Sequence, residues 1–133
     1  MGVASTPRNK EGFSIVISFS VPEARNQLLE NGVVYTYRWK RRAFFEKGLG
    51  DLEHTWANEG RHKPSIGYVW IEEIGQIEAN EENLEQYASK SGFYNVAEWV
   101  LTIIELGLRA KRDGWLYKVT QVSQQLRSKE TEK

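Results

Sequence analysis

The sequence contains no cysteine among its 133 residues. This absence excludes disulfide bonds, a catalytic thiolate and any zinc site built from cysteine. Long apolar runs are absent too: nowhere do about 18 apolar residues follow one another, which is the length that a membrane-spanning helix needs. Because no apolar run follows the first basic residues either, we expect no signal peptide, no contact with a membrane and a cytoplasmic location.

Net charge is also lacking, because 18 basic residues balance 18 acidic ones. A balanced charge argues against a protein that binds every polyanion. The two signs are nevertheless separated along the chain. Residues 38–47 hold five basic residues and one acid, whereas Glu72–Glu85 holds six glutamates and no base. If these segments lie on different faces, one face would attract a phosphate backbone. The other would be a solvated surface or would bind a protein partner.

Aromatic residues, by contrast, are plentiful, and five Trp, six Tyr and five Phe can fill one core. Apolar residues alternate along four segments, as they do in strands. Three further segments carry apolar residues at helical spacing. The expected strands are residues 13–19, 33–40, 66–77 and 115–122, and the expected helices are residues 22–32, 80–92 and 95–107.

Short signals mark the ends of two of these helices. Ser20 with Glu23, and Asn95 with Glu98, have the spacing of a capping box at a helix start. Gly32 follows the last apolar residues of the first helix, which is the position where a left-handed residue commonly ends a helix. These signals predict where the two helices begin and where the first one ends.

The chain is expected to form one domain, at residues 13–122. Residues 1–12 are polar and predict a disordered lead, and residues 123–133 predict a polar tail. Residues 43–65 are interpreted as a long loop with one short helix near residues 51–58, and residues 113–114 as a turn. The element order β-α-β-loop-β-α-α-β predicts an α+β fold, a small mixed β-barrel with flanking helices.

Three stretches of sequence resemble one known family when they are taken in order. They are LLENGVVYTYR at residues 28–38, YASKSGFYNVAEW at residues 87–99 and GWLYKV at residues 114–119. Together they resemble the ASCH domain of the PUA-like superfamily, over residues 13–122. The resemblance implies a PUA-like barrel with a cleft beside the motif strand, and a role in binding RNA or modified nucleosides.

The family's strand motif, G-x-K-x-x-E-x-R, is only partly kept here. Aligned on Arg38, its glycine falls on Asn31, its lysine on Val33 and its glutamate on Thr36. Some ASCH members are amidohydrolases that deacylate a modified cytidine with a Lys-Thr-Glu set. Thr36 matches the threonine of that set, but Val33 stands at the lysine and Gly92 at the glutamate. A threonine hydroxyl without a neighbouring base is not activated, so we expect binding rather than catalysis.

The basic stretch that follows the motif strand has the chemistry of a nucleic-acid site. Guanidinium groups bind phosphate in bidentate fashion, and an indole ring can stack on an unpaired base. The ligand expected from this chemistry is RNA or another single-stranded nucleic acid, with phosphate contacts and aromatic stacking. The candidate binding residues are Thr36, Arg38, Trp39, Lys40, Arg41, Arg42, Arg61, His62 and Lys63.

Each part of this candidate site also has a plainer interpretation. The basic stretch could be the solvated end of a strand, with Trp39 in the core and Thr36 chosen as a strand former. The second basic segment, residues 60–64, could close over the same cleft or could be an ordinary solvent loop. Trp56 could anchor its loop or offer an exposed stacking surface.

No metal or other cofactor is expected. His54 and His62 are the only histidines, and they lie eight residues apart in a segment that also contains acidic residues. Their spacing does not match the helix-face pattern H-E-x-x-H. A nuclease or another nucleoside-processing enzyme remains the alternative to a binding module, and a protein-interaction domain is the third hypothesis.

Overall fold

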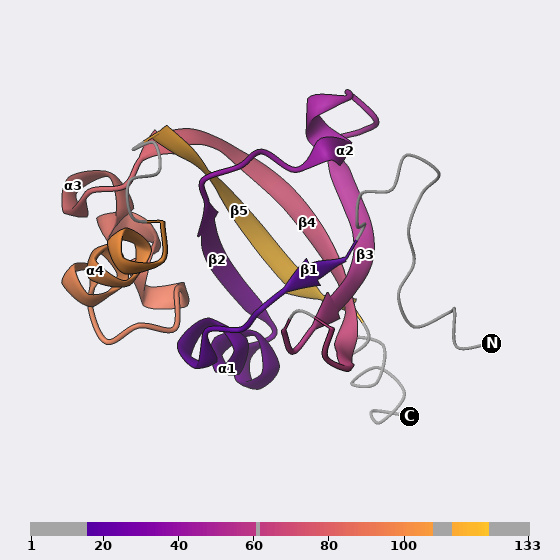
Figure 1. Cartoon of the computed structure of the whole chain (residues 1–133), viewed down its shortest axis with the longest axis horizontal. Coiled ribbons are helices and arrows are strands. Elements are labelled where there is room, and N and C mark those ends of the chain that lie inside the picture. Colours follow the sequence, from indigo (N-terminus) through magenta and orange to yellow (C-terminus); the bar gives the residue numbers. More distant parts are fainter. Residues whose placement is uncertain (1–15, 61, 108–112, 123–133) are drawn as a thin grey trace.

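The computed structural model describes residues 16–60, 62–107 and 113–122 (Figure 1). In chain order the elements are β1 (Ile17–Ser18), α1 (Pro22–Asn31), β2 (Val33–Arg38), α2 (Ala43–Glu46), β3 (Leu52–Asn58), β4 (Ser65–Glu78), α3 (Glu81–Leu84), the 3-10 helix η2 (Glu85–Lys90), α4 (Val96–Gly107) and β5 (Asp113–Gln121). No helix among these residues is long and apolar enough to cross a membrane.

The strands form one sheet in the order β1-β3-β4-β5-β2, which curls into a half-barrel (Figure 1). β1 runs parallel to β3, and the other neighbouring pairs are antiparallel. The pairing of β4 with β5 shifts register between Glu73 and Gly75, where such an irregularity helps a long strand to bend. The predicted α+β class is confirmed, and the curled half-barrel is consistent with the small mixed barrel that was expected.

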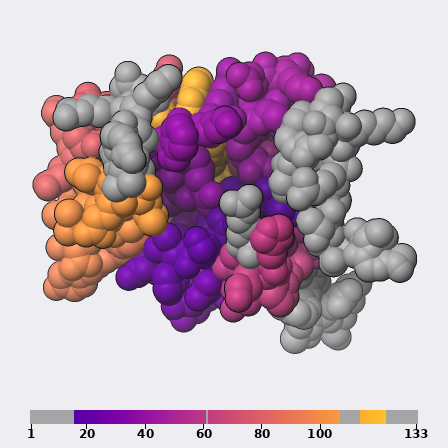
Figure 2. Space-filling model, in the orientation of Figure 1, coloured from indigo at the N-terminus to yellow at the C-terminus, as the bar shows by residue number. Residues whose placement is uncertain are grey.

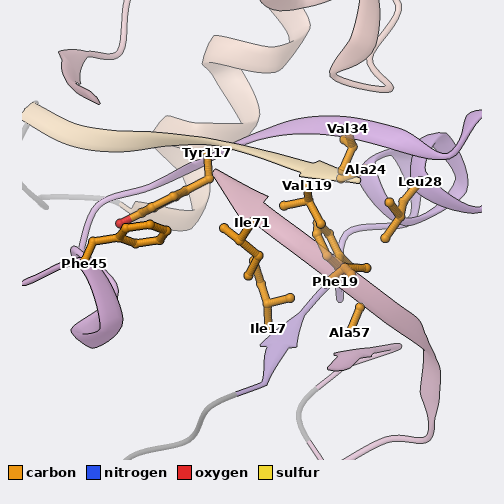
Figure 3. Packing of buried hydrophobic residues seen from close by; sticks show 11 residues of the cluster. Ile17, Phe19, Ala24, Leu28, Val34, Phe45, Ala57, Ile71, Tyr117 and Val119 are labelled. Atoms are coloured by element: carbon orange, nitrogen blue, oxygen red, sulfur yellow. The ribbon is translucent and has the colours of Figure 1, made fainter. Parts of the chain in front are cut away.

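The main core fills the concave side of the sheet. Ile17 and Phe19 from the first segment meet Val34 of β2, Ile71 of β4 and Val119 of β5 (Figure 3). All five are at most 2% exposed, and burial of side chains of this size stabilises the fold by about 1.5–3 kcal/mol each. The core therefore ties both ends of the described chain to the middle of the sheet.

A second apolar cluster lies on the outer face of β2 and β5, beneath α3, η2 and α4. Its buried members are Leu84, Val96, Trp99 and Leu116. β2 is thus covered on both faces, because Val34 and Thr36 point into the barrel while Tyr35 and Tyr37 pack under the helices. This arrangement fixes β2 firmly at the point where the basic stretch begins.

The helix predicted near residues 51–58 is wrong, because these residues form β3. Their side chains do alternate, but Glu53 and Thr55 point into the barrel while Trp56 points out. Polar residues inside and an aromatic residue outside invert the usual pattern of a strand. The longer loop predicted at residues 43–65 is accordingly replaced by α2, β3 and the start of β4.

The capping box predicted at Ser20 is also wrong. The helix begins one residue later, with Val21 as its N-cap and Pro22 as its first residue, so the hydroxyl of Ser20 is out of place for a cap. The other two signals are confirmed: Gly32 has φ 81° and donates to the carbonyl of Leu28 at 2.9 Å. The backbone N–H of Glu98 donates to Oδ1 of Asn95 at 2.9 Å.

Three boundaries also differ from the sequence-based expectation. Residues 113–114 belong to β5 rather than to a turn, and Gly114 is needed because a Cβ there would lie 2.5 Å from the ring of Tyr37. The helix expected at residues 80–92 is divided between α3 and η2. Of the first predicted strand, residues 13–15 lie outside the described residues, and β1 is short.

Candidate functional site

A cleft of about 440 Å³ opens where the segment after β1 meets the end of β2. One wall is residues 18–21 with Ala24, the second is residues 35–42, and the third comes from α4 and the residues before it. Figure 2 shows the surface hollowed between α1 (indigo) and the segment that follows β2 (purple), with α4 (orange) beside it. The position next to β2 is the one that the ASCH resemblance implies.

Arg38 ends β2 and lies in this cleft. Its Nη2 donates to the carbonyl oxygen of Ser18 at 2.9 Å, and its Nε donates to Oγ1 of Thr36 at 3.2 Å. The guanidinium carbon lies 5.2 Å from the centre of the Phe19 ring. Among the described residues no carboxylate pairs with Arg38, so its charge is balanced by a carbonyl, a hydroxyl and a ring face alone.

The surroundings of Arg38 make its charge costly. Burial, together with the nearby positive charge of Arg42, lowers its pKa to about 10. The guanidinium is still cationic at neutral pH. A partly desolvated cation without an anion is the state that an incoming anionic group stabilises most.

The next two basic residues are in a different situation, because each is paired with a glutamate. Arg41 donates to Glu73 through Nε at 2.9 Å and Nη2 at 2.8 Å, and it lies over the Trp115 ring. Arg42 donates to Glu53 at 2.7 and 2.9 Å. Bidentate pairs of this kind are the strong form of the contact.

Tyr117 links these two ion pairs from inside the barrel. Its hydroxyl accepts the backbone N–H of Arg42 at 2.8 Å and donates to Oε2 of Glu73 at 3.2 Å. Burial raises the pKa of Tyr117 to about 12. The hydroxyl therefore stays protonated at neutral pH and keeps its role as a donor. Residues 41–42 are held to the barrel by this network.

Between these anchored positions, Trp39 and Lys40 project into solvent. Trp39 is 53% exposed, so the interpretation that placed it in the core is wrong. Lys40 is exposed and forms no ion pair within the described part of the chain. Thr36, in contrast, is only 7% exposed and faces the cleft as the acceptor of Arg38. The six candidates between Thr36 and Arg42 thus line one cleft. Among the described residues, two of these cations, Arg38 and Lys40, have no carboxylate partner.

The second basic segment lies beside the cleft rather than in its wall. Gly60 packs near Ser20, whose Cβ lies 3.7 Å from the position that a Cβ on Gly60 would take. His62 and Lys63 are exposed and do not line the cleft. Arg61, the remaining candidate, lies outside the described residues.

The position that the resemblance assigns to a catalytic glutamate is blocked by the fold. Gly92 has φ 93°, and a Cβ there would lie 2.1 Å from the carbonyl oxygen of Glu23. A side chain at this position would displace the start of α1. Within the described ranges, no group of three or more His, Cys, Asp or Glu side chains could hold a metal ion.

The acidic segment from Glu72 to Glu85 does not form one face at its start. Glu72 is exposed on the outer side of β4, whereas Glu73 points to the other side and binds Arg41. A protein partner that uses the whole segment as one surface gains no support from this arrangement.

Sequence reasoning missed the carboxylates that neutralise the basic stretch and missed the role of α4. Trp99 and Ile103 of α4 are packed in the second cluster and also line the cleft. In the sequence, the helical spacing of Trp99 and Ile103 indicates a buried helix face but does not indicate a cleft. No family model, no curated protein sequence and no solved structure matches this chain.

Proposed function

We propose that this protein is a binding module for single-stranded RNA or a nucleotide, held in the cleft beside β2. The observation that carries the proposal is Arg38, a partly buried guanidinium without a carboxylate partner in the described chain, at the wall of a cleft of about 440 Å³. A phosphate oxygen would supply the missing anion in bidentate geometry. The resemblance to ASCH domains supports the same class of ligand.

The rest of the cleft suits the other parts of a nucleotide. Trp99, Ile103 and Phe93 supply apolar surface in the same cleft as Arg38, on which a base can pack. Trp39 is exposed next to Lys40, so its ring can stack on a neighbouring unpaired base while the ammonium group contacts the backbone. Unpaired bases are required for both contacts, which is why a single strand is favoured over a duplex.

Binding is favoured over catalysis because the described residues place no general base near Thr36. The lysine position of the family's amidohydrolases is Val33, and the glutamate position is the blocked Gly92. The hydroxyl of Thr36 contacts a cationic guanidinium, which cannot take up its proton. The cleft therefore offers recognition groups without an activated nucleophile.

The proposal is tested by fluorescence anisotropy with labelled single-stranded RNA, single-stranded DNA and duplexes. Arg38→Gln should weaken binding of single strands about 10- to 100-fold, because a hydrogen bond to a charged group contributes about 1.5–3 kcal/mol. Lys47→Gln is the matched control, since it removes one exposed positive charge that is not in the cleft.

Three results would contradict the proposal. One is equal weakening by Lys47→Gln and Arg38→Gln, which would show a general charge effect. Another is full binding by Arg38→Gln. The third is binding of modified nucleosides without binding of RNA, which would make the free nucleoside the ligand and refute the phosphate contact.

A further inference from the structure

Four aromatic rings lie together on the outer face of β3 and β4, away from the cleft. His54 is opposite Trp70 across the two strands, and Trp56 is opposite Tyr68. The ring centres of the first pair are 5.4 Å apart in a stacked arrangement, and those of the second are 5.1 Å apart edge to face. We call these four residues the aromatic stripe.

The aromatic stripe is not part of either apolar core. Trp56 is 42% exposed and Trp70 is 39% exposed, whereas the alternate residues Thr55 and Val69 are at most 2% exposed. The contacts within each pair hold the rings in place before any ligand arrives, so little side-chain entropy remains to be lost on binding. An exposed group of large rings on a sheet is typical of a surface that binds something.

A basic turn connects the aromatic stripe with the cleft. The described residues of this turn, 59–60 and 62–64, follow the end of β3 at Asn58, two residues after Trp56. The turn is fastened to α1 by Arg25, whose Nη1 donates to the carbonyl oxygen of Glu59 at 3.1 Å. Its Gly60 packs near Ser20 in the wall of the cleft, and Lys63 is exposed. In Figure 2 the magenta β3–β4 region lies directly beside α1.

The charges differ between the turn at Lys63 and the aromatic stripe, so the two regions suit different parts of a ligand. Lys63 and the free cations of the cleft can contact phosphates. At the far end of the stripe, however, Glu72 lies directly opposite Lys118, so the two charges there balance. A ligand on the stripe must therefore be held by its rings rather than by its phosphates.

We propose that the aromatic stripe stacks unpaired bases of the same single strand whose phosphate is held at Arg38. The inference rests on the function proposed above and makes it more specific: the ligand is an extended strand that leaves the cleft, passes the turn at Lys63 and lies across β3 and β4. Rings two residues apart on one strand repeat every 6.4–6.8 Å or so, which lets successive splayed bases use successive rings.

The test compares a short and a long oligonucleotide, a labelled uridine dinucleotide and a uridine octamer, by anisotropy. The wild type should bind the octamer more tightly than the dinucleotide. Trp56→Thr with Trp70→Thr should reduce that advantage, because the octamer affinity should fall by about 5- to 150-fold for each stacking ring removed while the dinucleotide affinity stays unchanged. Threonine is chosen because it is compatible with a strand.

Two further variants separate this inference from the proposed function. Arg38→Gln should weaken binding of both oligonucleotides. Leu101→Ala, which removes exposed apolar surface on α4, should change neither. Far-UV circular dichroism and the unfolding midpoint establish that the stripe variant is folded.

The outcomes are distinguishable. If the octamer keeps its full advantage in the stripe variant, or never has one in the wild type, the stripe inference is wrong and the cleft proposal stands. If neither oligonucleotide binds the wild type, both are wrong. Binding of decaproline that depends on Trp56 and Trp70, with oligonucleotide affinity unaffected, would overturn the inference in favour of a proline-rich partner.

Discussion

Salt dependence gives the sharpest test of how the cleft uses its positive charges. The sequence offers six Lys and Arg side chains in the two basic segments. If all six contacted phosphates of a single strand, log K would fall with log salt at a slope of about −4.2, since each phosphate contributes about −0.7. Within the described part of the chain, Arg38 and Lys40 are the cleft cations without a carboxylate partner, which gives a slope of about −1.4.

The two values are easily separated in the laboratory. Between 50 and 200 mM salt the affinity should fall about sevenfold for two phosphate contacts and about 300-fold for six. Octamer binding to the Lys63→Gln protein, measured by anisotropy at four salt concentrations, gives the slope, because the octamer carries enough phosphates for either value and the variant removes the contact proposed outside the cleft. A slope far steeper than about −1.4 would refute the reasoning, because it would mean that the ion pairs of Arg41 and Arg42 open when the ligand binds.

A variant extends the same test to Arg41. Glu73→Gln removes the carboxylate that holds this guanidinium and should steepen the slope to about −2.1, one further phosphate contact. Glu72→Gln is a closely matched control, because it removes an adjacent carboxylate that points to the other side of β4. If both variants steepen the slope equally, the cause is the change in the overall charge of the protein, and release of Arg41 from its ion pair is not the explanation.

Further predictions concern stability. Glu53→Gln leaves a buried guanidinium unpaired and should lower the free energy of unfolding by about 3 kcal/mol, whereas Glu72→Gln should change it by less than about 0.5 kcal/mol in the same urea titration. Gly92→Ala should destabilise far more than Gly48→Ala, because both have positive φ but only Gly92 would collide with backbone. Phenolate absorbance should show a component near pH 12 that Tyr117→Phe removes. Since the folded-state pKa of this tyrosine is raised, its contribution to stability is full below pH 10 or so and is lost as the pH rises towards 12.

Alternation along the chain predicted four of the strands, because apolar residues recur at every second position along them. It failed at β3, where the inward residues Glu53 and Thr55 are polar and the outward Trp56 is aromatic. The inversion has a cause at long range: Glu53 enters the barrel to pair with Arg42. No rule based on local periodicity contains that partner, so the segment was interpreted as a loop with a short helix.

The residues of the basic stretch lie together at one cleft, but the charge they present there differs from the sequence-based expectation. The carboxylates that neutralise Arg42 and Arg41 come from β3 and β4, 11 and 32 residues further along the chain. Counting charges in a window cannot show such pairs, because they are made by the curl of the sheet. Glu73 was even assigned to a separate acidic face.

The ion pairs that remove two cations from the cleft also determine how the remaining groups are presented. Residues 38–42 are fixed at one end by Arg38 and at the other by the pairs of Arg41 and Arg42, so the backbone between them has little freedom. Trp39 and Lys40 are therefore displayed in a nearly fixed position, and less entropy is lost when a base stacks there. On this reasoning Arg42→Met, which keeps a long side chain and loses the pair with Glu53, should weaken ligand binding although Arg42 itself contacts no phosphate. Unchanged affinity in a folded Arg42→Met protein, measured by the same anisotropy assay, would show that the pairs serve stability alone.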